Sequence, residues 1–130
     1  MKLNFSIAFA GDEISLYDRK GNAVAYIAVD DELTIYLWEG KPVAYLDGEH
    51  VYGFNGKHLG WFSKGLIIDH DGNIPCVIKE SYPGYTNYES YKGYKSYRPY
   101  KSYKEYAPYK PYSSRKFSNV PCSLFLAFGK

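Results

Sequence analysis

The stretch TIYLWEGKPVAYL, residues 34–46, decides the fold because the chain holds four copies of its pattern. A glycine follows Tyr36 by four residues, and the small residue Ala44 follows that glycine by another four, just before two large apolar residues. A repeat of this length is one supersecondary unit, which buries its apolar face only by stacking on its neighbours. The other copies are ISLYDRKGNAVAYI at 14–27, HVYGFNGKHLGWF at 50–62 and LIIDHDGNIPCVI at 66–78, where Ile68 replaces the tyrosine.

Each copy has the pattern of a β-hairpin with its glycine in the turn. Asn55-Gly56 and Asp71-Gly72 are dipeptides that supply the positive φ of tight hairpin turns. The flanking residues are mostly β-branched or aromatic, as strands prefer. The sequence therefore predicts an all-β fold, with four consecutive β-hairpin repeats in a pseudo-four-fold rosette, barrel-like or propeller-like. The predicted turn glycines are Gly21, Gly40, Gly56 and Gly72.

The four-hairpin body is expected to span residues 1–80. Residues 3–9 alternate apolar and polar side chains, which is typical of a half-buried strand. The same segment has a faint likeness to a secretory signal peptide, but its apolar run is short and interrupted by Asn4 and Ser6. The strand is therefore the favoured interpretation.

Residues 12–80 resemble the bacterial family called the four-fold beta flower. The likeness is carried by residues 34–46, by residues 51–62 and by the Asp69-His70-Asp71-Gly72 turn. The resemblance implies the rosette architecture. The family has a fold name and no established activity, so it implies no catalytic residue.

A tyrosine occupies every third position from Tyr82 to Tyr112. A polyproline II helix has three residues per turn and would place all eleven rings on one edge, whereas an α-helix would spread them around its surface. The third register holds mostly glycine, serine and proline. The sequence therefore predicts that residues 81–116, called the arm below, are extended and polyproline II-like. The basic residues that follow tyrosines are Lys92, Lys95, Arg98, Lys101, Lys104 and Lys110.

Opposite charges on the body and the arm suggest that the two pack together. Residues 1–80 hold seven basic and twelve acidic residues, and residues 81–116 hold eight basic and two acidic ones. Apolar residues alternate again from Val120 to Phe128, so residues 117–130 are predicted to be a C-terminal strand that returns to the body. The arm would then girdle the body once with its tyrosines facing inward. The alternative is a free, disordered basic tail.

The chain has two cysteines, and the sequence does not decide whether they form a disulfide. Cys76 occupies the small-residue position of the repeat and is expected to be a small buried side chain. A bond to Cys122 requires an oxidising compartment.

Asp69-His70-Asp71 is the cluster that could indicate metal binding or acid–base catalysis. It falls on a predicted hairpin turn, where polar residues are common, and its partners His50 and His58 come from other parts of the chain. No phosphate-binding loop, serine nucleophile motif or CxxC pair is present. We therefore expect turn residues, with no catalytic residue, metal ligand or cofactor.

The favoured function is a non-catalytic binding or structural module that uses the rosette as a scaffold. The alternative is binding of nucleic acid or a glycan through the arm, and nucleic-acid binding would require a free arm. An enzyme that uses Asp69, His70 and Asp71 is the less favoured hypothesis. The sequence leaves the partner open, with a protein or a glycan as the candidates. No membrane span is predicted, and a cytoplasmic location is slightly favoured over secretion. The candidate binding residues are Trp38, Tyr91, Tyr94, Tyr97, Lys95, Arg98 and Lys101.

Overall fold

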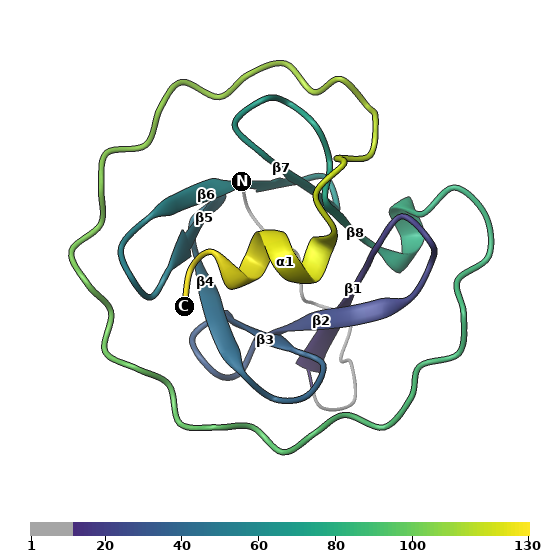
Figure 1. Ribbon diagram of the computed structural model, residues 1–130, viewed down its shortest axis with the longest axis horizontal. Coiled ribbons are helices and arrows are strands. Elements are labelled where there is room, and N and C mark those ends of the chain that lie inside the picture. The colour runs from purple at the N-terminus through teal and green to yellow at the C-terminus, as the bar shows by residue number, and fades with distance from the viewer. Residues whose placement is uncertain (1–11) are drawn as a thin grey trace.

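The computed structural model describes residues 12–130, and the predicted strand at residues 3–9 lies outside them. Eight antiparallel strands close into a barrel in which each strand pairs with the next and β1 pairs with β8 (Figure 1). The predicted all-β rosette of four hairpins is confirmed. The strands are β1 (Glu13–Tyr17), β2 (Ala23–Ala28), β3 (Thr34–Leu37), β4 (Pro42–Asp47), β5 (His50–Gly53), β6 (His58–Ser63), β7 (Leu66–Ile68) and β8 (Cys76–Ile78).

Each predicted turn glycine lies in the turn of one hairpin and has a positive φ. The angles are +82° at Gly21, +105° at Gly40, +88° at Gly56 and +85° at Gly72. In the first and last hairpins an aspartate caps the turn, since Asp18 and Asp69 each accept two backbone N–H bonds through one carboxylate oxygen. The repeat thus corresponds to one hairpin, as the spacing predicted.

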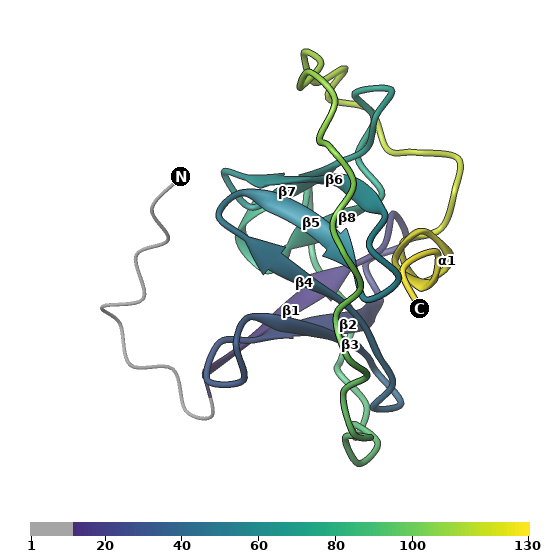
Figure 2. The same ribbon diagram turned by 90° about the vertical axis from the view of Figure 1, so that its left-hand side faces the viewer.

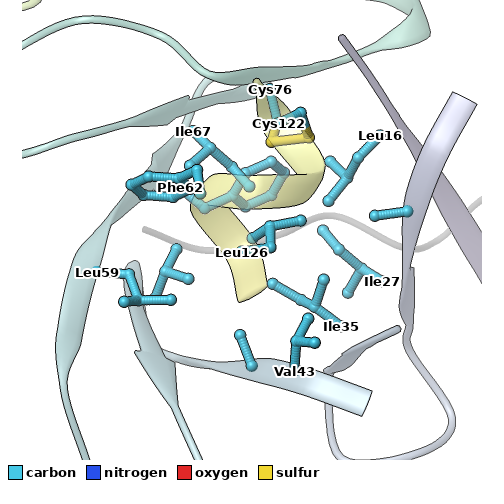
Figure 3. Packing of buried hydrophobic residues seen from close by; sticks show 14 of the residues in the cluster. Leu16, Ile27, Ile35, Val43, Leu59, Phe62, Ile67, Cys76, Cys122 and Leu126 are labelled. Carbon is cyan, nitrogen blue, oxygen red and sulfur yellow. A yellow bond between two sulfur atoms is a disulfide. The ribbon is translucent and has the colours of Figure 1, made fainter. Parts of the chain in front are cut away.

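Alternation along the strands separates two sets of side chains. Ala25 and Ile27 belong to the main core cluster, whereas Tyr26 between them belongs to a separate cluster with Tyr36. Successive side chains of a strand point to opposite faces, so the aliphatic residues fill the barrel and the strand tyrosines lie on its outer face. Figure 3 shows aliphatic side chains from several strands meeting around Leu126.

The C-terminal segment is a helix, so the predicted strand at residues 117–130 is wrong. Helix α1 spans Cys122–Ala127 and crosses one end of the barrel (Figure 1). Cys122, Phe125 and Leu126 are buried at helical spacing, while Leu124 is 51% and Phe128 50% exposed. The strand prediction was wrong because the alternating pattern treated Leu124 and Phe128 as buried residues. A closed barrel also leaves no edge at which a further strand could pair.

A disulfide between Cys76 and Cys122 joins β8 to α1. Both residues belong to the main core cluster (Figure 3). The bond thus fixes the helix to the barrel that it closes, and it resolves the question that the sequence left open.

The arm runs around the barrel from β8 to α1, as Figure 1 shows looking down the barrel and Figure 2 shows edge-on. A short 3-10 helix, Lys79–Ser81, precedes it, and the residues from Tyr85 to Tyr112 contain no helix or strand. The predicted girdle is therefore present in the structure. Among residues 12–130, no helix is both long and apolar enough to cross a membrane.

Candidate functional site: the outer edge of the arm

Backbone hydrogen bonds tie the arm to the four hairpin turns at every ninth residue. The N–H groups of Asn87, Ser96, Glu105 and Ser114 donate to the carbonyl oxygens of Gly21, Gly40, Gly56 and Gly72, at 2.7 to 2.9 Å. Two further bonds, from Gly93 to Trp38 and from Ser102 to Phe54, repeat the same nine-residue step. Three repeats of the three-residue sequence period therefore match one quarter of the barrel, and the period of the arm follows the pseudo-symmetry of the body.

The turn glycines are also required for the close approach of the arm. A Cβ atom on Gly40, Gly56 or Gly72 would collide with the main-chain carbonyl oxygen of Tyr94, Tyr103 or Tyr112 respectively. The arm residues in these three contacts are again nine apart. The sequence pattern gave one reason for glycine, the positive φ, and the structure adds a second.

The basic edge of the arm faces the barrel. Lys92 and Lys95 both pair with Glu13, at 2.9 and 3.0 Å. Burial acts to raise the pKa of the Glu13 carboxyl, but the hydrogen bonds and positive charges of the two lysines lower it below its ordinary value. Exposed pairs of this kind contribute at most about 1 kcal/mol each. The other pairs are Arg98 with Asp31 and Glu32, Lys101 with Glu32, Lys104 with Asp47, and Lys110 with Glu49.

The same ammonium groups lie over the tyrosines of the outer barrel face. The Lys101 nitrogen is 4.2 Å from the ring centroid of Tyr45, and the Lys104 nitrogen is 5.8 Å from that of Tyr52. Lys92 and Lys95 stand over Tyr26 at 5.0 and 5.8 Å. Cation–π contacts at desolvated sites are worth more than exposed ones, and these three tyrosines are no more than 6% exposed. Burial raises the pKa of Tyr26 to about 12, with smaller contributions from Glu13 and Asp31.

The two carboxylates of the arm also face inward. Glu89 accepts a hydrogen bond of 2.5 Å from the Tyr17 hydroxyl, and Glu105 accepts one of 2.7 Å from the backbone N–H of His58. From Tyr82 to Tyr112, every charged side chain of the arm therefore has a partner on the barrel.

The tyrosine edge of the arm faces away from the barrel, so the prediction of inward tyrosines is wrong. Only Tyr82 is half-buried, with its hydroxyl donating to the Arg19 carbonyl. Inward tyrosines would have left the barrel carboxylates without the arm cations, and the barrel already presents tyrosines of its own. Ten residues, called the outer tyrosines below, are each at least 99% exposed: Tyr85, Tyr88, Tyr91, Tyr94, Tyr97, Tyr100, Tyr103, Tyr106, Tyr109 and Tyr112.

The candidate binding residues divide between these two edges. Tyr91, Tyr94 and Tyr97 are outer tyrosines, while Lys95, Arg98 and Lys101 form the ion pairs with the barrel. Trp38 is half-buried, its indole N–H donates to the carbonyl oxygen of Ser90 at 3.1 Å, and Lys92 stands over its ring at 4.8 Å. The Trp38 ring therefore contacts the arm and is only partly open to solvent.

Three histidines, His50, His58 and His70, lie together beside the third hairpin. The sequence did not predict this contact. His58 is 2% exposed, and its two ring nitrogens contact His50 at 3.0 Å and His70 at 2.9 Å. Burial lowers the pKa of His58 to about 4, and the neighbouring histidines His70 and His50 add to this. The register of the hairpin could have revealed the first contact, because Tyr52 pairs with His58 and places His50 on the same face.

His58 and His70 border a surface cavity of about 490 Å³ at the α1 end of the barrel, together with Asp69, Asp71 and Glu105. Asp69 is used to cap its turn. Among the described residues, no group of histidine, cysteine, aspartate and glutamate side chains has a geometry that could hold a metal ion. The arrangement is a chain of ring-to-ring hydrogen bonds that packs against Trp61.

A family model matches residues 14–126, which contain the four hairpins except the first residue of β1, the whole arm and most of α1. The chain belongs to the 4-fold beta flower protein family. The match extends beyond the residues that carried the resemblance and includes the whole arm. No curated protein and no solved structure matches this 4-fold beta flower protein. The family name describes the fold and gives no activity.

Proposed function

We propose that this protein is a non-catalytic binding module whose working surface is the row of outer tyrosines. One observation carries the proposal: ten aromatic side chains are fully exposed on a backbone that is fixed to the barrel at every quarter turn. Large aromatic rings rarely face water completely, and exposed ones in a group mark interaction sites. The barrel and α1 serve as the frame that holds the row in place.

Fixing the arm supports this role, because a binding surface gains affinity when its order is established before the partner arrives. The rings of a free tail would have to be ordered during binding, at a cost in conformational entropy. Here the backbone of the arm is ordered by hydrogen bonds to the turns and by the ion pairs beneath it. Only the tyrosine side chains remain to be fixed by a partner.

The geometry weighs against the alternatives considered for the arm and the histidines. Nucleic-acid binding needs cations that are free to meet phosphates, and the arm cations between Lys92 and Lys110 are paired with barrel carboxylates. A catalytic histidine needs a ring nitrogen available to its substrate, and both nitrogens of His58 contact other histidines. In the Asp69-His70-Asp71 turn, the Asp69 carboxylate already accepts two backbone N–H bonds.

The test compares the wild-type protein with a variant that lacks three neighbouring rings, Tyr91→Ser, Tyr94→Ser and Tyr97→Ser. Both would be screened on an array of glycans, single-stranded nucleic acids and peptides. We expect the wild-type protein to retain at least one ligand class that the variant loses. A control variant, Ser96→Ala and Ser102→Ala, changes the same part of the arm without removing a ring and should bind normally.

Equal retention of every ligand by the wild-type protein and the tyrosine variant would contradict the proposal. The absence of any bound ligand would contradict it as well. Circular dichroism and the intact disulfide of each variant would establish that the fold survives the substitutions.

A further inference from the structure

We infer that the outer tyrosines bind an uncharged polysaccharide chain laid along the arm. This inference rests on the proposed function and adds the chemical class of the partner. It follows from three properties of the edge, which are its charge, the chemistry of its rings and their spacing.

Between Tyr85 and Tyr112, the outer edge carries aromatic hydroxyl groups, and every charged side chain of this part of the arm has a partner on the barrel. The six cations from Lys92 to Lys110 pair with barrel carboxylates, and Glu89 and Glu105 hydrogen-bond to barrel groups. A phosphate or sulfate polymer would therefore find no free cation, and a cationic polymer would find no free carboxylate, along this edge. Electrostatic complementarity governs which partners are accepted, and this edge is complementary to a neutral one.

Tyrosine suits a polyhydroxylated, uncharged partner. Its ring offers a flat apolar face, which can stack on the C–H face of a sugar ring, and its hydroxyl can both donate and accept a hydrogen bond. With at least 99% of each residue exposed, both the faces and the hydroxyl of every outer tyrosine are open to such contacts. Flat aromatic faces also tolerate small differences between successive sugars.

The spacing of the rings favours a long chain over a single sugar. Successive outer tyrosines are three residues apart, which corresponds to about 9 Å along an extended backbone that rises 3.1 Å per residue. The arm continues around the barrel (Figure 1), so a polymer laid along it can meet many of the exposed rings at once. Linked contacts of this kind raise the overall affinity far above that of one contact.

The experiment measures binding to soluble neutral polysaccharides by affinity electrophoresis and calorimetry. The probes are a β-glucan, a galactomannan, a xylan and a pullulan, each as the polymer and as short oligosaccharides. Poly(dT) and heparin serve as anionic probes. We expect at least one neutral polymer to bind, with affinity that rises with chain length and changes little with salt. Each ring removed by Tyr→Ser should weaken binding roughly two- to tenfold.

Tyr→Phe replacements at Tyr91, Tyr94 and Tyr97 should retain most of the binding, because they keep the stacking face. The Ser96→Ala and Ser102→Ala variant should bind like the wild-type protein. Failure to bind any neutral polymer would overturn the inference. If poly(dT) or heparin binds instead and depends on the outer tyrosines, the partner class is wrong while the proposed function stands. If none of these probes depends on the outer tyrosines, the inference is wrong, and the proposed function is wrong as well if the peptides of the array also show no dependence on them.

Discussion

The backbone N–H of Ser96 donates to the carbonyl oxygen of Gly40 at 2.9 Å, so the arm recognises the hairpin turn through main-chain groups. The same contact recurs at the other three turns, nine arm residues apart. It depends on a turn without a side chain, because a Cβ on Gly40 would meet the carbonyl of Tyr94. Docking of the arm is therefore determined by the turn glycines as well as by the lysines of the arm and the carboxylates and tyrosines of the barrel that they contact.

Replacing Gly40 with alanine should both destabilise the protein and detach this part of the arm. A positive φ costs an L-residue about 1–2 kcal/mol, and a lost hydrogen bond adds about 1 kcal/mol. We therefore expect a decrease of about 2–3 kcal/mol in the free energy of unfolding, measured by denaturant titration. Hydrogen exchange at Gly93 and Ser96 should become faster.

Gly48→Ala is the matched control for this prediction. Gly48 also has a positive φ, +61°, but a Cβ at that position would meet no atom within 4 Å. It should lose about 1 kcal/mol of stability and leave hydrogen exchange of the arm unchanged. The same change in both variants would show that the arm does not depend on close approach to the turn.

Removal of the disulfide should destabilise the protein substantially. The bond joins residues 46 apart, and closing a loop of that length stabilises a fold by about 4 kcal/mol in the chain-entropy description. We expect a loss of this size in a Cys76→Ala and Cys122→Ala variant, measured by denaturant titration. Reduction of the wild-type protein should have a similar effect, and an unchanged unfolding midpoint under reducing conditions would contradict the prediction.

Stability should fall as the pH drops from about 6.5 to 4 because of His58. Burial lowers the pKa of His58 to about 4 in the folded protein, against an ordinary value of 6.5. Between these values the unfolded chain binds a proton that the folded protein does not, so the free energy of unfolding decreases as the solution becomes more acidic. The full effect is on the order of 3 kcal/mol.

A His58→Gln variant isolates this contribution, because the carboxylates that titrate nearby remain in place. Its free energy of unfolding should decrease less than that of the wild-type protein over the same pH range. Parallel pH profiles would show that His58 does not control the acid sensitivity.

The sequence predicted the barrel because the decisive signal is local. Positive φ at Gly56 and the flanking strand residues are encoded within one hairpin, and repetition supplies the rest. The orientation of the arm was not predictable in the same way. It depends on which edge meets the barrel, and that depends on Glu13 and Tyr45, which come together with Lys92 and Lys101 only in the folded protein.

The C-terminal helix and the histidine chain were missed for related reasons. Alternation from Val120 to Phe128 fits a strand, yet Cys122, Phe125 and Leu126 fit a helix equally well. Closure of the barrel, a property of the whole fold, decides between them. His58 and His70 are twelve residues apart and meet only because β6 pairs with β7.

The orientation of the arm can be tested with two proteases of different specificity. Trypsin must place a lysine or arginine in its specificity pocket, and the side chains of Lys92, Lys95 and Lys101 face the barrel. Chymotrypsin must place an aromatic side chain there, and the outer tyrosines are free to enter. We therefore expect chymotrypsin to cut the native arm several-fold faster than trypsin, each rate being normalised to that of the same protein unfolded in urea. Mass spectrometry would place the first cuts after outer tyrosines between Tyr85 and Tyr112.

A Lys101→Gln and Lys104→Gln variant has a weakened contact between the arm and the barrel, so its remaining tryptic sites should be cut faster. Equal normalised rates for the two enzymes would mean that the arm detaches before either one acts, and faster tryptic cleavage would mean that the basic edge faces outward.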